Sequence, residues 1–307
     1  MRALRLVAPR RAECVEVPEP SPGPGEVRVR IDACGLCGSD LNSWRGVPGV
    51  EFPLPAGAPG HETYGEVLAL GQDVVGLGVG QRVTGLMWNG FAESGIATVD
   101  NLLPVPVELG PGPVIGEPLA CAMNVIRRSG VAPGDRVAIV GFGYLAALVA
   151  HLLPTEPGEW IAISRRCESR ALARHMGASA VYDFSSVPDS AWDSFDIVIE
   201  ATGVQAALDV ATWLTASAGR LVIAGYHADG PRTVNMQSWN WKGIDVINAH
   251  ARRPDVYLDA LRRSFEVLRQ RPLPALVSHT WPLDRAADAF AAAEARPPGF
   301  TKGLVIP

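Results

Sequence analysis

Short apolar stretches, separated by glycine and proline, fill the first 110 residues of the chain. Residues 27–31 and 65–70 are two such stretches, and each has the length of a single strand. Because turn residues follow each stretch closely, they mark the ends of strands and not interruptions of helices. We therefore expect this region of the chain to be rich in β-strands.

The pattern changes near residue 130, where short buried runs begin to alternate with helical stretches. We expect helices at 144–153, 168–176 and 205–214, and strands at 136–140, 160–164, 180–182, 196–200 and 219–224. Strands that alternate with helices predict a parallel, doubly wound sheet with right-handed crossovers. The predicted fold class is α/β, with a β-rich region before this sheet.

The alternation ends after about residue 250. Helices are expected at 256–269 and 283–295, and strands at 276–280 and 303–306. This tail is too long to be one more repeat of the parallel sheet, so we expect it to return and complete the β-rich region. The predicted domains are residues 1–120 together with 254–307, and residues 121–253.

Composition is that of an ordinary soluble enzyme, with 48% hydrophobic and 19% charged residues in 307. The net charge of −5 gives no overall field that favours nucleic acid or an anionic membrane. No apolar run reaches ~18 residues, and the N-terminus lacks a signal-peptide core, so we expect a cytoplasmic protein. Five cysteines argue against a disulfide framework. Lysine occurs only at Lys242 and Lys302, which we interpret as the codon bias of a GC-rich genome.

A glycine turn follows the expected strand 136–140 and opens the expected helix at 144. It reads Gly141-Phe142-Gly143-Tyr144-Leu145-Ala146 and fits the dinucleotide form G-x-G-x-x-G/A. The first glycine allows the tight turn, and the second lets the backbone approach a pyrophosphate. The motif alone is weak, but its place between strand and helix favours a cofactor site over an ordinary turn. Its expected contacts are Gly141, Gly143, Tyr144 and Leu145.

The end of the next strand distinguishes between two cofactors. An NAD site usually has an acid about 20 residues beyond the turn, where it binds the ribose diol. Here Ser164 takes that place, and Arg165 and Arg166 follow it. Serine removes the repulsion toward a 2′-phosphate, and two guanidinium groups can bind that phosphate. We expect NADP(H) in preference to NAD(H); the alternative is that both arginines are solvated surface charges.

Four potential metal ligands precede the glycine turn: Cys37, His61, Glu62 and Glu117. A thiolate, an imidazole and carboxylates together suit zinc. Cys34 and Cys37 form a CxxC pair with no second pair to match it, which argues against a structural zinc knuckle. Cys34 is expected to be a small buried thiol.

Taken in order, these motifs resemble the zinc-dependent alcohol dehydrogenases of the medium-chain dehydrogenase/reductase superfamily, in the polyol-dehydrogenase-like branch. The likeness covers nearly the whole chain and rests on ACGLCGSD (33–40), GHETYGEV (60–67), VGLGVGQRV (75–83), GFAE (90–93), GEPLACAMNVIRR (116–128), VAIVGFGYLA (137–146), DIVIEATG (196–203) and GRLVIAG (219–225). The resemblance implies a GroES-like catalytic domain, a Rossmann domain, and a C-terminal tail that rejoins the catalytic domain. It also places Thr202 and Gly225 at the cofactor.

The resemblance implies a role for each motif residue. Cys37 and His61 match the two leading ligands of the catalytic zinc, and Glu117 matches the third. Glu62 matches an acid that approaches the metal or orders its surroundings, and Cys121 is a less favoured ligand. Asp40 matches the acid that orients the imidazole. Ser39 matches the hydroxyl that bonds the substrate oxygen and passes on its proton.

Two departures from the family matter. The lobe with four closely spaced cysteines that binds a structural zinc is absent, so we expect one zinc per chain. Many members carry a proton-relaying histidine two residues after the acid of the first motif, where this chain has Asn42. Asparagine does not titrate near neutral pH. The relay then runs through ribose and water, or Asn42 bonds the substrate.

The expected reaction is hydride transfer between the nicotinamide and a secondary alcohol, a polyol or the corresponding ketone. Trp44, Met87 and Trp88 are expected on the substrate side with Asn42, although core packing is the alternative for the tryptophans. Two other functions stay open: a zinc-free NADPH-dependent enone or quinone reductase, and a non-catalytic NADPH-binding protein. We expect a homodimer or homotetramer, pairing through sheet edges near residues 220–246.

Overall fold

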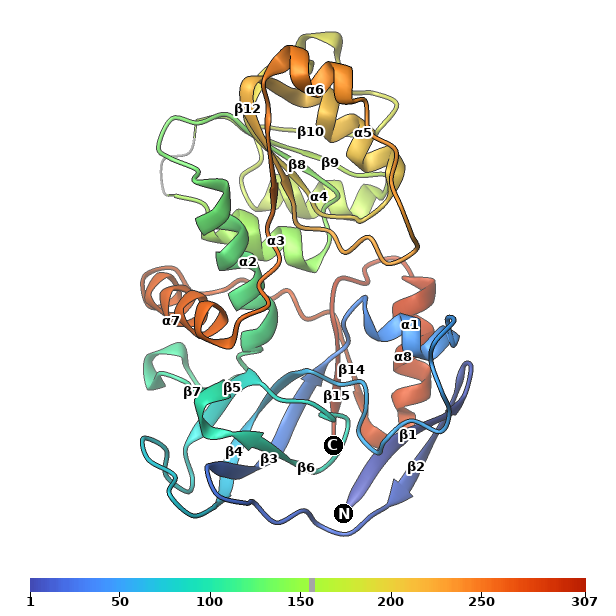
Figure 1. Cartoon of the computed structure of the whole chain (residues 1–307), viewed down its shortest axis with the longest axis vertical. Coiled ribbons are helices and arrows are strands. Elements are labelled where there is room, and N and C mark those ends of the chain that lie inside the picture. Colours follow the sequence, from blue (N-terminus) through green and yellow to red (C-terminus); the bar gives the residue numbers. More distant parts are fainter. Residues whose placement is uncertain (155–157) are drawn as a thin grey trace. The chain divides into compact units, whose positions relative to one another are not determined.

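The chain divides into two compact units in the computed structural model, which describes residues 1–154 and 158–307 (Figure 1). The first unit is Met1–Ala120 with Arg253–Pro307, and the second is Cys121–Arg252. The tail therefore rejoins the first unit at Arg253, a single residue before the expected boundary. No helix among the described residues combines the length and the apolar character needed to cross a bilayer.

The first unit is built on a seven-stranded sheet in the order β14-β15-β3-β4-β5-β7, with β6 paired to β3. Its strands are β3 (Glu26–Gly35), β4 (Glu62–Leu70), β5 (Arg82–Leu86), β6 (Ser94–Thr98), β7 (Leu102–Pro104), β14 (His279–Pro282) and β15 (Gly303–Ile306). A hairpin of β1 (Arg2–Ala8) and β2 (Arg11–Glu16) stands beside it as a separate sheet. Because β15 pairs with β3, the C-terminal tail completes the N-terminal fold.

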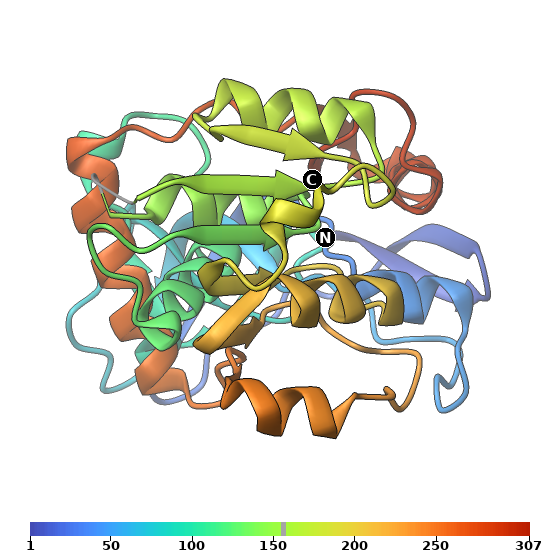
Figure 2. The same cartoon turned by 90° about the horizontal axis from the view of Figure 1, so that it is seen from above.

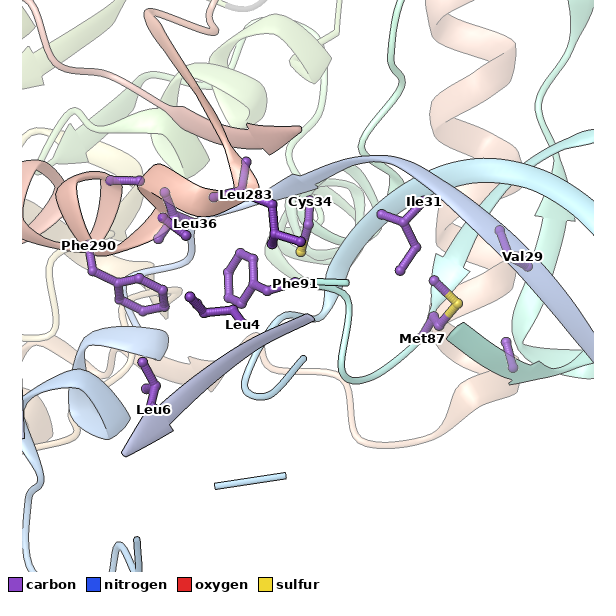
Figure 3. Close-up of a cluster of buried hydrophobic side chains, with 14 of the residues drawn as sticks. Leu4, Leu6, Val29, Ile31, Cys34, Leu36, Met87, Phe91, Leu283 and Phe290 are labelled. Atoms are coloured by element: carbon purple, nitrogen blue, oxygen red, sulfur yellow. The ribbon is translucent and has the colours of Figure 1, made fainter. Parts of the chain in front are cut away.

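Three helices of this unit are α1 (Asp40–Arg45), α7 (Pro254–Gln270) and α8 (Ala286–Ala295), and the first turn of α2 (Gly116–Ser129) also belongs to it. The helix expected over 283–295 begins as a 3₁₀ turn at Leu283–Arg285. The core lies between α8 and strands β1 and β3, and Figure 3 shows its central side chains. Phe290 of α8 is fully buried, and its ring meets Phe91 edge-on at 5.3 Å.

The second unit is a six-stranded parallel sheet in the order β10-β9-β8-β11-β12-β13 (Figures 1 and 2). The strands are β8 (Val137–Val140), β9 (Trp160–Ile163), β10 (Ala180–Tyr182), β11 (Phe195–Glu200), β12 (Thr215–Ile223) and β13 (Asp245–Asn248). Helices α3 (Tyr144–Leu152), α4 (Cys167–His175), α5 (Gln205–Leu214) and α6 (Met236–Lys242) connect them. The strand order reverses between β8 and β11, which confirms the doubly wound fold.

Burial explains why these segments form a covered sheet. Every residue of β8 and β9 is buried, so both faces of the central strands are covered, as parallel sheets require. Helix α5 buries Ala207, Leu208, Ala211 and Leu214, which form one stripe of a helix. Strand β13 and helix α6 were not predicted from the sequence. Strand β13 is a largely exposed edge strand and lacks the buried apolar run that marks the other strands.

Candidate metal centre and dinucleotide-binding edge

Three of the four expected metal ligands meet in the first unit. One ligand atom each from Cys37, His61 and Glu62 lies within 4.8 Å of the other two, in the only such group found among the described residues. The sheet produces this convergence, because Gly35 at the end of β3 pairs with Glu62 at the start of β4. Cys37 follows the first strand and His61 precedes the second, so both stand at the same sheet end.

Asp40 orients the imidazole of this group. Its Oδ1 lies 3.2 Å from His61 Nδ1, and its Oδ2 accepts a hydrogen bond of 2.9 Å from the Cys37 backbone N–H. The carbonyl of Pro59 also lies 3.2 Å from Nδ1. Two oxygens at Nδ1 place the proton there, which leaves Nε2 as the ligand atom in the neutral ring.

Electrostatics show why this group suits a cation. Burial raises the pKa of the Cys37 thiol, the bond from His61 opposes this, and Glu62 and Asp40 raise it further. Burial lowers the pKa of His61, but hydrogen bonds to Asp40 and Cys37 outweigh it and raise that pKa to about 12. Asp40 and Cys37 thus stabilise a positive charge at a position that is largely buried. A thiolate, an imidazole and a carboxylate are a donor set that fits zinc.

Lys302 is a residue of this centre that sequence reasoning missed. Its side chain is 4% exposed, and its ammonium pairs with Glu62 Oε2 and donates to the carbonyl of Leu36 at 2.8 Å. Lys302 directly precedes β15, so the tail delivers a cation to the sheet end where Cys37 and Glu62 stand. One signal was available, since Lys302 is one of only two lysines and both are buried.

Glu117 does not belong to the group within 4.8 Å. It is half-buried in the first turn of α2, directly after Gly116. The hydroxyl of Thr84 accepts from the Gly116 N–H at 2.8 Å and donates to the Thr63 carbonyl at 2.6 Å. The helix start that carries Glu117 is therefore bonded through β5 to the residue next to Glu62.

The residues expected around the substrate separate into two groups. Ser39 and Asn42 are half-buried at the start of α1, and Trp88 is 62% exposed with its ring 5.8 Å from that of His61. The prediction for Trp44 and Met87 is wrong, because both are side chains of the hydrophobic core (Figure 3 labels Met87). Trp44 stacks on Phe290 at 5.2 Å, and its Nε1 donates to Glu294.

The glycine turn in the second unit connects β8 to α3 as expected. Gly141 has φ of 90°, and a Cβ there would lie 2.1 Å from Thr202 Cγ2, so only glycine fits. A Cβ built on Gly143 meets no atom within 4 Å, which leaves space beside the N-terminus of α3. Tyr144 and Leu145 form the first turn of this helix, where backbone N–H groups bind anions.

Ser164 directly follows β9 and is buried, with Arg165 exposed and Arg166 half-buried after it. The Arg166 Nε lies 4.0 Å from Glu168. Arg170, which sequence reasoning missed, donates to the carbonyls of Ser164 at 2.6 Å and Arg165 at 2.9 Å. These bonds fix the backbone of the loop that carries Arg165 and Arg166. The only sequence signal for Arg170 was that it is a third arginine close to these two.

Glu200, at the end of β11, was also missed. Its backbone carbonyl accepts from the N–H groups of Ala224 and Gly225, both at 2.8 Å. Its side chain is fully buried and accepts from the N–H groups of Thr202 and Gly203. Thr202 and Gly225 are thus brought together by one glutamate, whose only sequence signal was an acid at the end of an apolar strand.

Comparisons with known proteins agree with this architecture. Residues 23–106 match the alcohol dehydrogenase GroES-like domain, and residues 141–266 match the zinc-binding dehydrogenase domain. The chain is 27% identical to 2-dehydro-3-deoxy-L-galactonate 5-dehydrogenase of Pseudoalteromonas atlantica, covering 91% of each chain. It is 26% identical to a sorbitol dehydrogenase of Halalkalibacterium halodurans, covering 91% of this chain and 92% of the relative.

A solved structure extends the likeness over the full length. The crystal structure of a zinc-binding dehydrogenase of Sinorhizobium meliloti 1021, bound to NADP, matches with a TM-score of 0.86 and 26% identity, covering 100% of this chain and 99% of the other. The two domains and their site define a dehydrogenase of the medium-chain class. The chain belongs to the zinc-type alcohol dehydrogenase family of the medium-chain dehydrogenase/reductase superfamily and is an alcohol or polyol oxidoreductase.

Proposed function

We propose that this enzyme transfers a hydride between NADP(H) and a secondary alcohol or polyol, or the corresponding ketone, with one zinc ion per chain. The observation that carries the proposal is the convergence of Cys37, His61 and Glu62 within 4.8 Å. Three donors of different chemistry meet where the imidazole is already oriented by Asp40. Lys302 offsets the charge of Glu62, but the buried carboxylate of Asp40 beside that pair still favours a further cation.

Cys37 and His61 are proposed as two zinc ligands, with Glu117 as the third. Glu62 is proposed to approach the metal while Lys302 balances its charge. When bound, zinc polarises a carbonyl and lowers the pKa of an alcohol hydroxyl. The chain's own role is to hold the ligands in place, since Asp40 Oδ1 lies 3.2 Å from the imidazole Nδ1 and Asp40 Oδ2 accepts from the Cys37 backbone N–H.

Ser39 is proposed to bond the substrate oxygen and to exchange its proton. It directly precedes α1 and stands two residues after Cys37, with its side chain partly accessible. Asn42 is one turn further along and offers an amide that donates and accepts but does not titrate. The exposed ring of Trp88, beside His61, is proposed to contact the carbon skeleton of the substrate.

NADP(H) is the proposed cofactor. A buried Ser164 replaces the expected acid at the end of β9, and Arg165 and Arg166 follow on a loop fixed by Arg170. Charge-assisted bonds to a 2′-phosphate contribute about 1.5–3 kcal/mol each. The NADP in the related Sinorhizobium structure supports the same choice.

A zinc-free enone or quinone reductase and a non-catalytic NADPH-binding protein are less well supported. Neither function needs a thiol, an imidazole and a carboxylate within 4.8 Å.

For the quaternary structure, we propose a homodimer or homotetramer that pairs through β13. This strand lies at the edge of its sheet and exposes Val246, and an unpaired edge of this kind readily adds another strand.

The test is a screen of secondary alcohols and polyols for reduction of NADP and NAD, with the wild type and Cys37→Ala side by side. We expect alcohol-dependent reduction of NADP by the wild type and a loss of at least about 1000-fold in Cys37→Ala, the scale of a lost Lewis acid. Equal rates in a zinc-free Cys37→Ala protein contradict the proposal. Reduction of quinones or enones without zinc would favour the first alternative.

A further inference from the structure

A chain of buried polar side chains lies at the carboxyl edge of the parallel sheet, in the turns after β11 and β12. Glu200 is fully buried, and its Oε1 accepts from the backbone N–H of Thr202 at 2.7 Å and of Gly203 at 2.9 Å. Its Oε2 lies 3.1 Å from His227 Nε2. One carboxylate therefore bonds both the turn that follows its own strand and a residue after the neighbouring strand.

The donors in this chain determine the state of His227. Arg232 Nε lies 2.7 Å from His227 Nδ1, and a guanidinium group only donates hydrogen bonds. Nδ1 must therefore accept, which places the ring proton on Nε2, where it is donated to Glu200. His227 acts as a neutral bridge with one accepting and one donating end, and its side chain is only 16% exposed.

Further bonds join the loop after β12 to the turn after β11. Arg232 Nη2 donates to the carbonyl of Gly203 at 2.5 Å, and Arg232 also pairs with Asp229. The side chain of Gln205 donates to the carbonyl of Thr233 at 2.8 Å and accepts from its N–H at 3.0 Å. The loop over 226–233 thus has three attachments to the turn: through His227, Arg232 and Gln205.

The position of this edge indicates what it serves. The strand order reverses between β8 and β11, and ligands of open α/β sheets bind outside the carboxyl ends at such a point. Ser164 and the two arginines stand on the β9 side of the glycine turn, where the adenosine half is proposed to bind. The turns after β11 and β12 are on the other side of the switch point, which leaves them for the nicotinamide half.

Crowding keeps these two turns in one arrangement. A Cβ built on Gly225 would lie 2.2 Å from the Gly203 nitrogen, and one on Gly203 would lie 2.3 Å from the Tyr226 carbonyl oxygen. The backbones of the two turns are therefore in direct contact. A small shift of the loop after β12 moves Thr202, which in turn packs against Gly141 of the glycine turn.

We propose that His227 is a positioning residue for the nicotinamide half of the cofactor, acting through Glu200 and Arg232 on the turns after β11 and β12. The inference rests on the proposed function only in that this edge binds a dinucleotide. It requires no zinc and no substrate. The polarity of the bridge matters, so a side chain with one acceptor and one donor can replace the ring, and an apolar one cannot.

The experiment compares two ligands by calorimetry on the full-length chain without alcohol or ketone. NADPH contains both halves, and adenosine 2′,5′-bisphosphate contains only the adenosine half. His227→Leu is expected to weaken NADPH at least about 10-fold, the scale of an unsatisfied buried hydrogen bond, and to leave adenosine 2′,5′-bisphosphate within about 2-fold. His227→Gln, whose amide donates and accepts, is expected to restore most of the NADPH affinity.

His175→Leu on the exposed end of α4 is the matched control, and it is expected to change neither affinity. Unchanged NADPH binding in His227→Leu overturns the inference, and so does an equal loss of both ligands, which indicates general damage to the fold. Failure of His227→Gln to restore binding also overturns it. If the wild type binds no dinucleotide, the proposed function is refuted as well. If NAD is the tighter cofactor, the same comparison is made with NADH and 5′-AMP in place of NADPH and adenosine 2′,5′-bisphosphate.

Discussion

The ammonium of Lys302 and the carboxylate of Glu62 form a buried ion pair beside Cys37 and His61. Lys302 is 4% exposed and Glu62 is 2% exposed, and the two residues are 240 positions apart in the chain. The pair connects the C-terminal tail to the candidate metal centre. It explains how a carboxylate stays buried next to other acidic groups, and it ties the tail to this candidate site as well as to the sheet.

Replacing Lys302 by methionine leaves the Glu62 carboxylate buried without its cation. Breaking a buried pair on one side costs about 3–5 kcal/mol, so the free energy of unfolding is expected to fall by that amount. Chemical denaturation of the metal-free protein measures it. The double variant Lys302→Met, Glu62→Gln removes both charges and should recover some of the loss. A double variant less stable than Lys302→Met alone contradicts this view of the pair.

Asp40→Asn tests the orientation of the imidazole. The amide no longer holds the His61 Nδ1–H through a charge, so zinc affinity is expected to fall about 10–100-fold while the fold is retained. Competition with a chromophoric chelator measures the affinity. Asp32→Asn, a partly exposed acid on β3 that pairs with Arg30, is the control. Equal zinc affinity in Asp40→Asn and the wild type would show that Asp40 does not position the ligand.

Cofactor choice is tested by Ser164→Asp. A carboxylate at the end of β9 repels a 2′-phosphate and binds a ribose diol, so the ratio of kcat/KM for NADP over NAD is expected to fall about 10–100-fold. Arg165→Gln with Arg166→Gln should move the ratio the same way by removing the cations. Arg174→Gln, an exposed arginine of α4, serves as the control. If the ratio stays at the wild-type value in Ser164→Asp and in the double arginine variant, Ser164 does not select the cofactor and the two arginines are surface charges.

Acid sensitivity is expected at Glu294. Hydrogen bonds from Arg10 and Arg45 lower its pKa from 4.5 to about 2. A folded-state pKa below the ordinary value means that the stabilisation is present above pH 4.5 and is lost as the pH falls toward 2. The difference in thermal midpoint between the wild type and Glu294→Gln should therefore be constant near neutral pH and shrink on acidification. A difference independent of pH contradicts the shifted pKa, and Glu13→Gln is the exposed control.

The sequence predicted those features of the structure that depend on local patterns. The strand, glycine turn and helix around Gly141 follow one another in the chain, and the central helix 205–214 has the expected bounds. The tail after residue 250 was recognised by its length alone. Strand β13 was missed because an exposed edge strand lacks a buried apolar pattern.

Long-range partners were beyond the reach of the sequence. Lys302 meets Glu62 because β15 and β4 both begin at one end of the first sheet, and His227 meets Glu200 because neighbouring strands of the second sheet end together. Trp44 shows the opposite error, since its closeness to Cys37 in sequence suggested a place at the substrate. The short helix α1 turns that ring inward onto Phe290 instead.

Zinc content per chain, measured by elemental analysis of protein purified without chelator or added metal, tests the central claim most directly. The convergence of Cys37, His61 and Glu62 predicts about one zinc per chain in the wild type and a value near zero in Cys37→Ser. A wild-type value near zero that does not recover when zinc is added would contradict the zinc-dependent mechanism, and a value near two would reveal a second metal site.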